Sequence, residues 1–140
     1  MFNRIVIANA VPGQHLPTRL SAAIKLAKQH GAELLMVSVE ELPQFPASVD
    51  EVVEEKTEAN YFFEGVISRA KAQAQAQAVK LRTHILAGHA VGTIVEFVAR
   101  ERPDLLVIGY MGHSALYNRV IGSTTDRLVE LAPCAVLVVK

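Results

Sequence analysis

Three glycines and two hydroxyl residues in the last third of the chain have the types and spacing of an anion site. They are Gly109, Gly112, Gly122, Ser123 and Thr124, in the order G-x2-G-x9-G-S-T, and they follow an apolar run that ends at Ile108. Glycine lets a backbone approach a ligand closely, and the unpaired N–H groups and dipole of a helix N-terminus favour phosphate. A strand that ends in glycine and leads to a glycine–serine helix start therefore predicts an anion site, with Ser123 as the N-cap.

The spacing matches neither the P-loop, G-x-x-x-x-G-K-[ST], nor the dinucleotide fingerprint, G-x-G-x-x-G. A second interpretation is open at this point. Gly109 and Gly122 could be the turn and cap residues of an ordinary strand–helix unit, because glycine ends many such elements.

The remaining chain alternates apolar runs with helical periodicity. Buried strands are predicted at Ile5–Ala8, Leu34–Val39, Leu105–Ile108 and Ala135–Val139, and a half-exposed edge strand at Val79–Leu86. Helices are predicted at Leu16–His30, from Ser48 to about Ala78, from Ala90 to about Arg100, and after Ser123. Asn9–His15 and Glu40–Pro46 are predicted to be loops. Strands that alternate with helices favour one parallel sheet with helices on both faces, an α/β fold.

Composition narrows the class of protein. The 140 residues suffice for one domain, residues 1–140, and 51% hydrophobic with 20% charged residues is typical of a folded globular chain. Fourteen basic and fourteen acidic residues cancel, which argues against nucleic acid or a membrane surface as a partner. One cysteine, no signal-peptide pattern and no apolar run of about 20 residues together favour a cytoplasmic protein.

With these motifs in place, the sequence resembles the universal stress protein family. The resemblance is carried by D-L-L-V-I-G before the glycine motif, by the motif itself, and by A-P-C-A-V-L-V-V at the end. It implies a single-domain, five-stranded parallel sheet in the order 3-2-1-4-5, and ATP or another adenine nucleotide (AMP or ADP) held by the glycine motif. Ligands of such sheets lie beyond the carboxyl ends of the strands where the strand order reverses. The loops after Ala8 and Ile108 are then expected to face each other.

The resemblance also assigns roles to residues. It places Gly109, Gly112, Gly122, Ser123 and the adjacent Thr124 at the phosphates, with His113 as a nearby cation, and Val37 where a backbone group meets the adenine. Ala8, Asn9 and Ala10 are placed on the nucleoside side.

One residue departs from the family's pattern. Ala10 stands where nucleotide-binding members have an aspartate, and a methyl group accepts no hydrogen bond. Asn9 is a candidate substitute, although its side chain starts from the other face if the strand extends that far. A lost hydrogen bond to a neutral partner costs about 0.5–1.5 kcal/mol, up to about tenfold in affinity.

No catalytic set is predicted. The five histidines have no ligand spacing, so no metal site of the protein's own is expected, and Mg²⁺ is expected to arrive with the nucleotide, held by its phosphates. Asp126 lies one turn into the last helix and is interpreted as a cap, so the chain is at most a slow ATPase.

Two functions of different classes remain. The first is a stress-response protein that binds an adenine nucleotide and acts as a dimer. The second is a dimeric interaction module that binds no nucleotide, which Ala10 favours and the glycine motif opposes. In both, the flat apolar strand Ala135–Val139 is expected to be an edge that pairs with a second copy.

Overall fold

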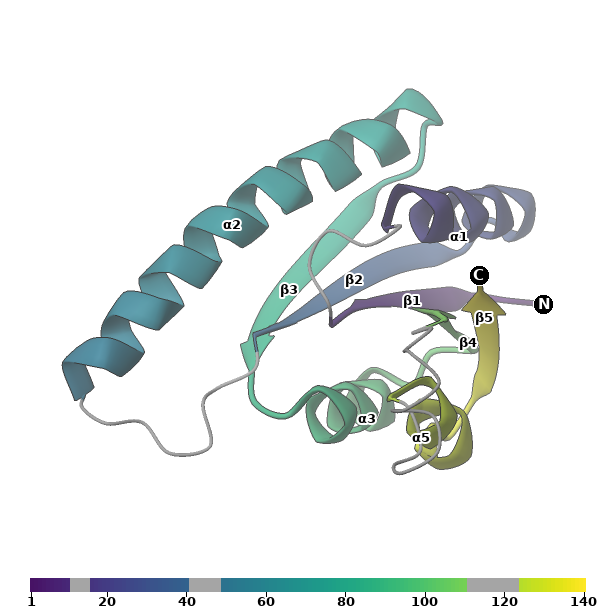
Figure 1. The fold of residues 1–140 in the computed structure, drawn as a ribbon. Coiled ribbons are helices and arrows are strands. Elements are labelled where there is room, and N and C mark those ends of the chain that lie inside the picture. Colours follow the sequence, from purple (N-terminus) through teal and green to yellow (C-terminus); the bar gives the residue numbers. More distant parts are fainter. Residues whose placement is uncertain (11–15, 41–48, 111–123) are drawn as a thin grey trace.

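The computed structural model describes residues 1–10, 16–40, 49–110 and 124–140, and residues 49–62 only as helical backbone. In chain order the elements are β1 (Arg4–Asn9), α1 (Leu16–His30), β2 (Glu33–Glu40), α2 (Val49–Ala76), β3 (Leu81–Ala87), α3 (Ala90–Glu101), β4 (Leu105–Gly109), α5 (Thr124–Leu131) and β5 (Ala135–Val139). The predicted alternation of strands and helices is confirmed (Figure 1).

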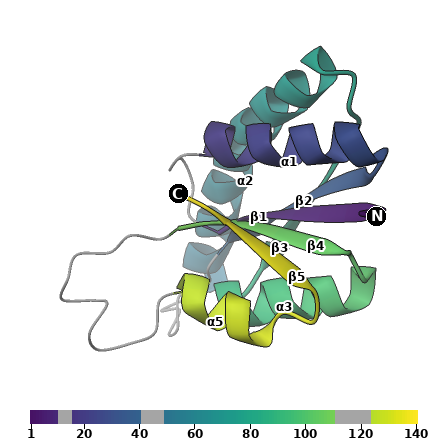
Figure 2. The same ribbon diagram turned by 90° about the vertical axis from the view of Figure 1, so that its right-hand side faces the viewer.

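The strands form one parallel sheet in the order β3-β2-β1-β4-β5. Helices α1 and α2 cover one face of the sheet, and α3 and α5 cover the other (Figure 2). The predicted α/β fold, strand order and two-sided cover are therefore confirmed. Because β3 and β5 end the order, each has a strand neighbour on one side only among the described elements.

Strict alternation along the strands divides the core between the two faces. In β1, Ile5 and Ile7 belong to the cluster under α1 and α2, whereas Val6 and Ala8 belong to the cluster under α3 and α5. Strands β2 and β4 divide in the same way. Central strands that are apolar on both faces are what a doubly covered parallel sheet requires.

The junction of α2 and β3 differs from the sequence prediction. The helix ends at Ala76 and the strand begins at Leu81, so Val79 belongs to neither element. Ala78 takes a positive φ of 59°, its N–H donates to the Gln75 carbonyl at 2.9 Å, and the Val79 N–H donates to the Ala74 carbonyl at 3.0 Å. These two bonds form a Schellman cap. Because the Val79 N–H is part of this cap, the strand begins only after Val79.

Asp104 fastens the amino end of the chain to the start of β4. Its Oδ2 accepts hydrogen bonds from the backbone N–H of Asn3 at 2.6 Å and of Arg4 at 2.9 Å, while its own N–H donates to the Arg4 carbonyl at 2.8 Å. The two backbone donors hold the pKa of the Asp104 carboxyl below its ordinary value.

Asp104→Asn is expected to remove an acid-sensitive part of the stability. A folded-state pKa below the unfolded one adds stability above the unfolded pKa, and that stability is lost as the pH falls through the folded pKa. Urea unfolding midpoints measured from pH 7 to pH 3 should fall less steeply in the variant than in the wild type. Glu130→Gln, at an exposed position of α5, is the control and should keep the wild-type slope. Equal slopes for all three proteins would contradict this role of Asp104.

Candidate functional site at the carboxyl edge of the sheet

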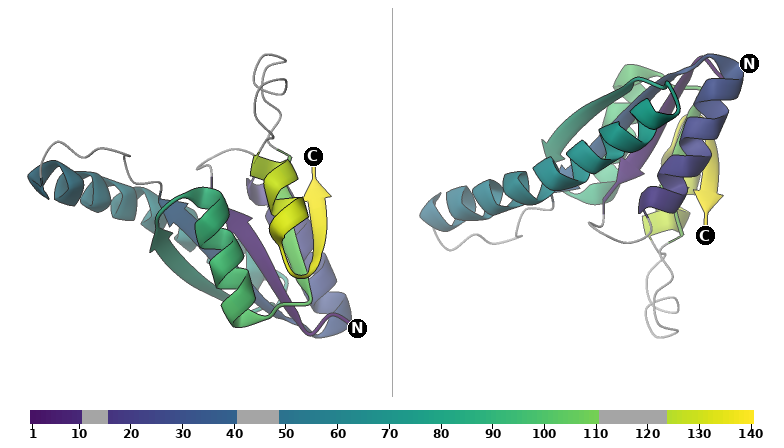
Figure 3. Two further views of the ribbon diagram at one scale, coloured as in Figure 1. Left: turned by 90° about the horizontal axis from the view of Figure 1, so that it is seen from below. Right: turned by 90° about the horizontal axis from the view of Figure 1, so that it is seen from above.

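The strand order reverses between β1 and β4, and the carboxyl ends of these two strands meet there. Ile7 is paired with Val107, and Asn9 and Gly109 each lie two residues further along their strands. The end of β1 and the end of β4 are thus brought together as predicted (Figures 1 and 3). Of the predicted site residues, Gly112, His113, Gly122 and Ser123 lie outside the described residues.

Asn9 belongs to the strand rather than to the loop that the sequence predicted. β1 continues through Asn9, which is paired with Ser38 of β2 and is fully buried. Its Nδ2 donates to Ser38 Oγ at 3.4 Å, and its Oδ1 has no hydrogen-bond partner in the described part of the chain. By alternation from Ile5 and Ile7, the Asn9 side chain lies on the α1 and α2 face.

Ala8 and Ala10 contact the opposite core, under α3 and α5. Ala8 is buried and Ala10 half-buried. Consecutive strand residues point to opposite faces of the sheet. The Asn9 amide therefore cannot take the place of a longer polar side chain at the position of Ala10.

Val37 lies within β2, between Ala8 of β1 and His84 of β3. It is fully buried, and its strand continues to Glu40. Its role at the adenine stays a prediction.

Gly109 leaves room for a neighbouring side chain, and its backbone conformation does not itself call for glycine. It is not among the glycines with positive φ. A Cβ built on it would lie 2.7 Å from Arg19 Cδ and 2.8 Å from Arg19 Nη1, closer than carbon and nitrogen atoms pack. The side chain of Arg19, from the first turn of α1, thus occupies the space that the missing side chain leaves.

Arg19 lies at this edge of the sheet, although the sequence did not single it out. It is 7% exposed and belongs to the buried stripe of α1, with Leu16, Leu20 and Ala23. Burial lowers the pKa of the Arg19 guanidinium, which remains a cation because arginine titrates far above neutrality. The sequence did contain a signal for this residue, because Arg19 is a charged residue next to the helically spaced apolar residues of α1.

Thr125 is the second residue that the sequence did not single out. It is 5% exposed, and its Oγ1 donates to the carbonyl of Gly109 at 3.0 Å. This bond holds the start of α5 against the end of β4. Helix α5 begins at Thr124, one residue after Ser123, and its axis therefore starts beside the carboxyl edge of the sheet.

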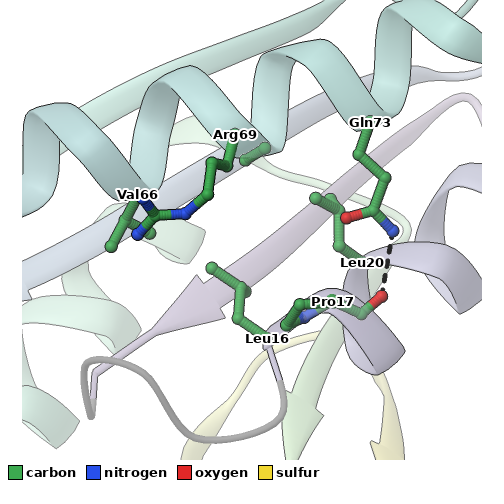
Figure 4. Close-up of a pocket in the computed structure, with 7 residues that line it drawn as sticks. Leu16, Pro17, Leu20, Val66, Arg69 and Gln73 are labelled. Carbon is green, nitrogen blue, oxygen red and sulfur yellow. Dashed lines mark hydrogen bonds between the residues drawn. The ribbon is translucent and has the colours of Figure 1, made fainter.

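A separate cavity of about 170 Å³ lies between α1 and α2 (Figure 4). Leu16, Leu20, Val66 and Ala70 form its apolar lining, and Gln73 closes it by donating to the Pro17 carbonyl at 3.0 Å. None of the predicted site residues lines it. Ligand pockets for drug-sized molecules measure about 300–1,000 Å³, so this cavity does not correspond to a nucleotide site.

In the described part of the chain, no group of three or more histidine, cysteine or acidic side chains is arranged to hold a metal ion. In the same part of the chain, no helix is both long enough and apolar enough to cross a membrane.

The sheet order, the two-sided helical cover and the hydrogen bond between the end of β4 and the start of α5 define a doubly wound α/β protein. Ligands of proteins with this architecture bind at the switch point. Residues 1–140 match the model of the universal stress protein family. The chain belongs to the universal stress protein family.

Relatives and solved structures agree with this assignment. A universal stress protein of Methanocaldococcus jannaschii is 31% identical over 126 residues, which cover 84% of this chain and 71% of that protein. One from Thermus aquaticus is 30% identical over 141 residues, covering all of both chains. Among solved structures, universal stress protein UspA from Lactobacillus plantarum has a TM-score of 0.81 at 25% identity and covers 99% of this chain and 97% of its own.

Two further solved structures carry adenine nucleotides. A universal stress protein in complex with cAMP has a TM-score of 0.79 at 20% identity, covering 99% of this chain and 97% of its own. The universal stress protein from Archaeoglobus fulgidus in complex with dAMP has a TM-score of 0.68 at 21% identity, covering 99% and 98%. At these identities the likeness shows a shared fold.

Proposed function

We propose that this protein binds an adenine nucleotide, ATP or else AMP or ADP, at the switch point between β1 and β4, and acts in the stress response as a homodimer in the cytoplasm. The observation that carries the proposal is the complete G-x2-G-x9-G-S motif from Gly109 to Ser123, placed between the end of β4 and the start of α5. The cAMP and dAMP complexes of proteins with the same fold support an adenine nucleotide as the ligand.

The described residues fit an anionic ligand at this edge in two respects. The Thr125–Gly109 bond places the N-terminus of α5 beside the end of β4, and the N–H groups of a helix N-terminus are suited to donate to phosphate oxygens. Arg19 adds a positive charge behind Gly109. Mg²⁺ would accompany the nucleotide on its phosphates, as a hard cation that prefers oxygen ligands.

The nucleoside side fits less well. Ala10 offers no hydrogen-bond acceptor in its side chain, and the Asn9 side chain lies on the opposite face of the sheet. The missing acceptor weakens binding by up to about tenfold. Phosphate contacts are therefore expected to dominate the affinity, and any hydrolysis of bound ATP is expected to be slow.

The test is the nucleotide content and affinity of the purified protein. Mass analysis of the small molecules released on denaturation, followed by calorimetric titration with Mg-ATP, should show a stoichiometric adenine nucleotide. Gly122→Val should abolish the binding, because a branched side chain blocks close approach of the backbone to phosphate. Gly92→Val, at an exposed position of α3 with open space around it, is the matched control and should bind as the wild type does.

The second candidate function, a dimeric interaction module without nucleotide, is favoured by Ala10. An empty extract, together with no heat and no melting shift at millimolar ATP, would select this module over the nucleotide binder. In that case the glycines of the motif would serve only as turn and cap residues, and Gly122→Val would change only the stability of the fold.

A further inference from the structure

An open groove of about 580 Å³ lies at the amino edge of the sheet, opposite to the switch point. It forms where α1 and α2, which cover the same face of the sheet, end and where β2 and β3 begin (Figure 2). Its lining residues come from two stretches, 27–34 and 78–82, which the structure describes without a gap. The volume is within the range of about 300–1,000 Å³ that is usual for small-molecule sites.

Backbone caps end both helices at the groove. Gly31 after α1 and Ala78 after α2 take positive φ angles of 63° and 59°. At the end of α1 the Ala32 N–H donates to the Ala27 carbonyl at 2.9 Å, and α2 ends in the Schellman cap described above. Because backbone donors already serve these helix ends, the lysine side chains nearby are not needed to cap them.

Three exposed cationic side chains line the groove, those of Lys28, Lys80 and Arg82. Glu33 is the acidic residue among the lining residues, and its Oε2 accepts a hydrogen bond from Arg4 Nε at 2.8 Å. Arg4 does not line the groove, so the charge of Glu33 is balanced from outside it. Within the described part of the chain, none of the three cations forms an ion pair.

This concentration of positive charge is local, because the chain as a whole is neutral. Residues 65–95 contain four basic residues and no acidic one, whereas residues 40–64 contain eight acidic residues and one basic one. Like charges that share a concave wall repel one another, and an anion between them replaces the repulsion by attraction. The groove is therefore electrostatically complementary to an anion.

We propose that this groove binds a small molecule with two or more negative charges on phosphate groups. Arg82 offers a planar fork of donors that matches phosphate oxygens, and the two lysines add compact charges on flexible stems. The volume and the neutral chain favour a small ligand over nucleic acid. The site is separate from the switch point, and it does not depend on the proposed function.

The experiment titrates inorganic pyrophosphate into the isotope-labelled full chain and follows the backbone amides by NMR. At low salt the amides of residues 27–34 and 78–82 should shift saturably, and added salt should weaken the binding. The double variant Lys28→Gln, Lys80→Gln should bind about 10-fold or more weakly, the scale of lost charge-assisted contacts.

The matched control is the double variant Lys25→Gln, Lys71→Gln. It removes the same charge from exposed positions of α1 and α2 that do not line the groove, so it should bind pyrophosphate as the wild type does. Equal weakening in both double variants would show that only net charge matters, and it would overturn the proposal.

Two other results would also overturn it. One is the absence of saturable shifts at the groove amides up to about 10 mM pyrophosphate, or shifts there with hexaglutamate alone, which would make an acidic peptide the ligand. The other is a set of shifts confined to Gly109, Thr124 and Thr125. That result would assign the anion to the switch point and support the proposed function without the groove.

Discussion

We expect Gly109→Ala to lower the free energy of unfolding by about 1–3 kcal/mol, which is the usual cost of overpacking a close-packed site. The added methyl carbon would meet Arg19 Cδ at 2.7 Å and Nη1 at 2.8 Å, so the arginine must leave its buried position or the strand must shift. The measurement is urea unfolding of the wild type and the variant. An unchanged unfolding midpoint would show that Arg19 moves away at no cost.

The matched control is Gly92→Ala, which should change stability in the opposite direction. Gly92 is the third residue of α3, and no atom beyond its chain neighbours and its own helix backbone lies within 4 Å of an added Cβ, so alanine there gains helix propensity, up to about 0.5–1 kcal/mol. Opposite signs for the same chemical change at two glycines separate steric conflict from propensity.

A double-mutant cycle assigns the conflict to Arg19. In the Arg19→Ala background the space beside Gly109 is open, so Gly109→Ala should cost less than in the wild type by roughly 1 kcal/mol or more, a coupling typical of residues in contact. Strictly additive effects would contradict the close packing of the two residues.

The second large expected effect concerns assembly. Leu137→Lys should convert the proposed homodimer into a monomer at micromolar concentration, as judged by sedimentation or light scattering. β5 ends the sheet order and has β4 as its strand neighbour in the described part of the chain, which leaves its other edge available to a second copy. Exposed apolar edges of this kind are normally covered.

The size of the expected loss of dimer affinity follows from the burial of Leu137 and from the added charge. Leu137 is half-buried in the protomer and packs beside the cluster under α1 and α2. In a symmetric pair each protomer contributes it once, and only its exposed half remains to be buried, so its loss removes two apolar contacts of roughly 0.8–1.5 kcal/mol each, on the order of a 10- to 100-fold weaker dimer. Lysine side chains near the symmetry axis add repulsion.

Val129→Lys is the matched control for assembly. Val129 is 50% exposed and belongs to α5 rather than to β5, so the same substitution there should leave a dimer formed by strand pairing intact. A wild type that is monomeric at micromolar concentration would remove the basis for the dimer altogether. Dissociation by both variants would place the interface on α5 rather than on the edge of β5.

The sequence by itself determined the architecture of this protein, because the architecture depends on patterns that each segment carries alone. Apolar runs at Ile5–Ala8 and Leu105–Ile108, between segments of helical period, were sufficient for the parallel sheet with helices on both faces. The half-polar pattern of β3 likewise placed it at the sheet edge. The predicted boundaries of helices and strands were wrong where backbone hydrogen bonds set them, as at the Schellman cap that includes Val79.

The tertiary structure decided what surrounds the switch point. Whether Asn9 belongs to a loop or faces the α1 and α2 core depends on how far β1 pairs with β2, and the pairing extends to Ser38. Arg19 and Gly109 are ninety positions apart in the sequence, and no spacing rule joins them. Only the packing of α1 on the end of β4 brings the Arg19 side chain into the space of the missing Cβ.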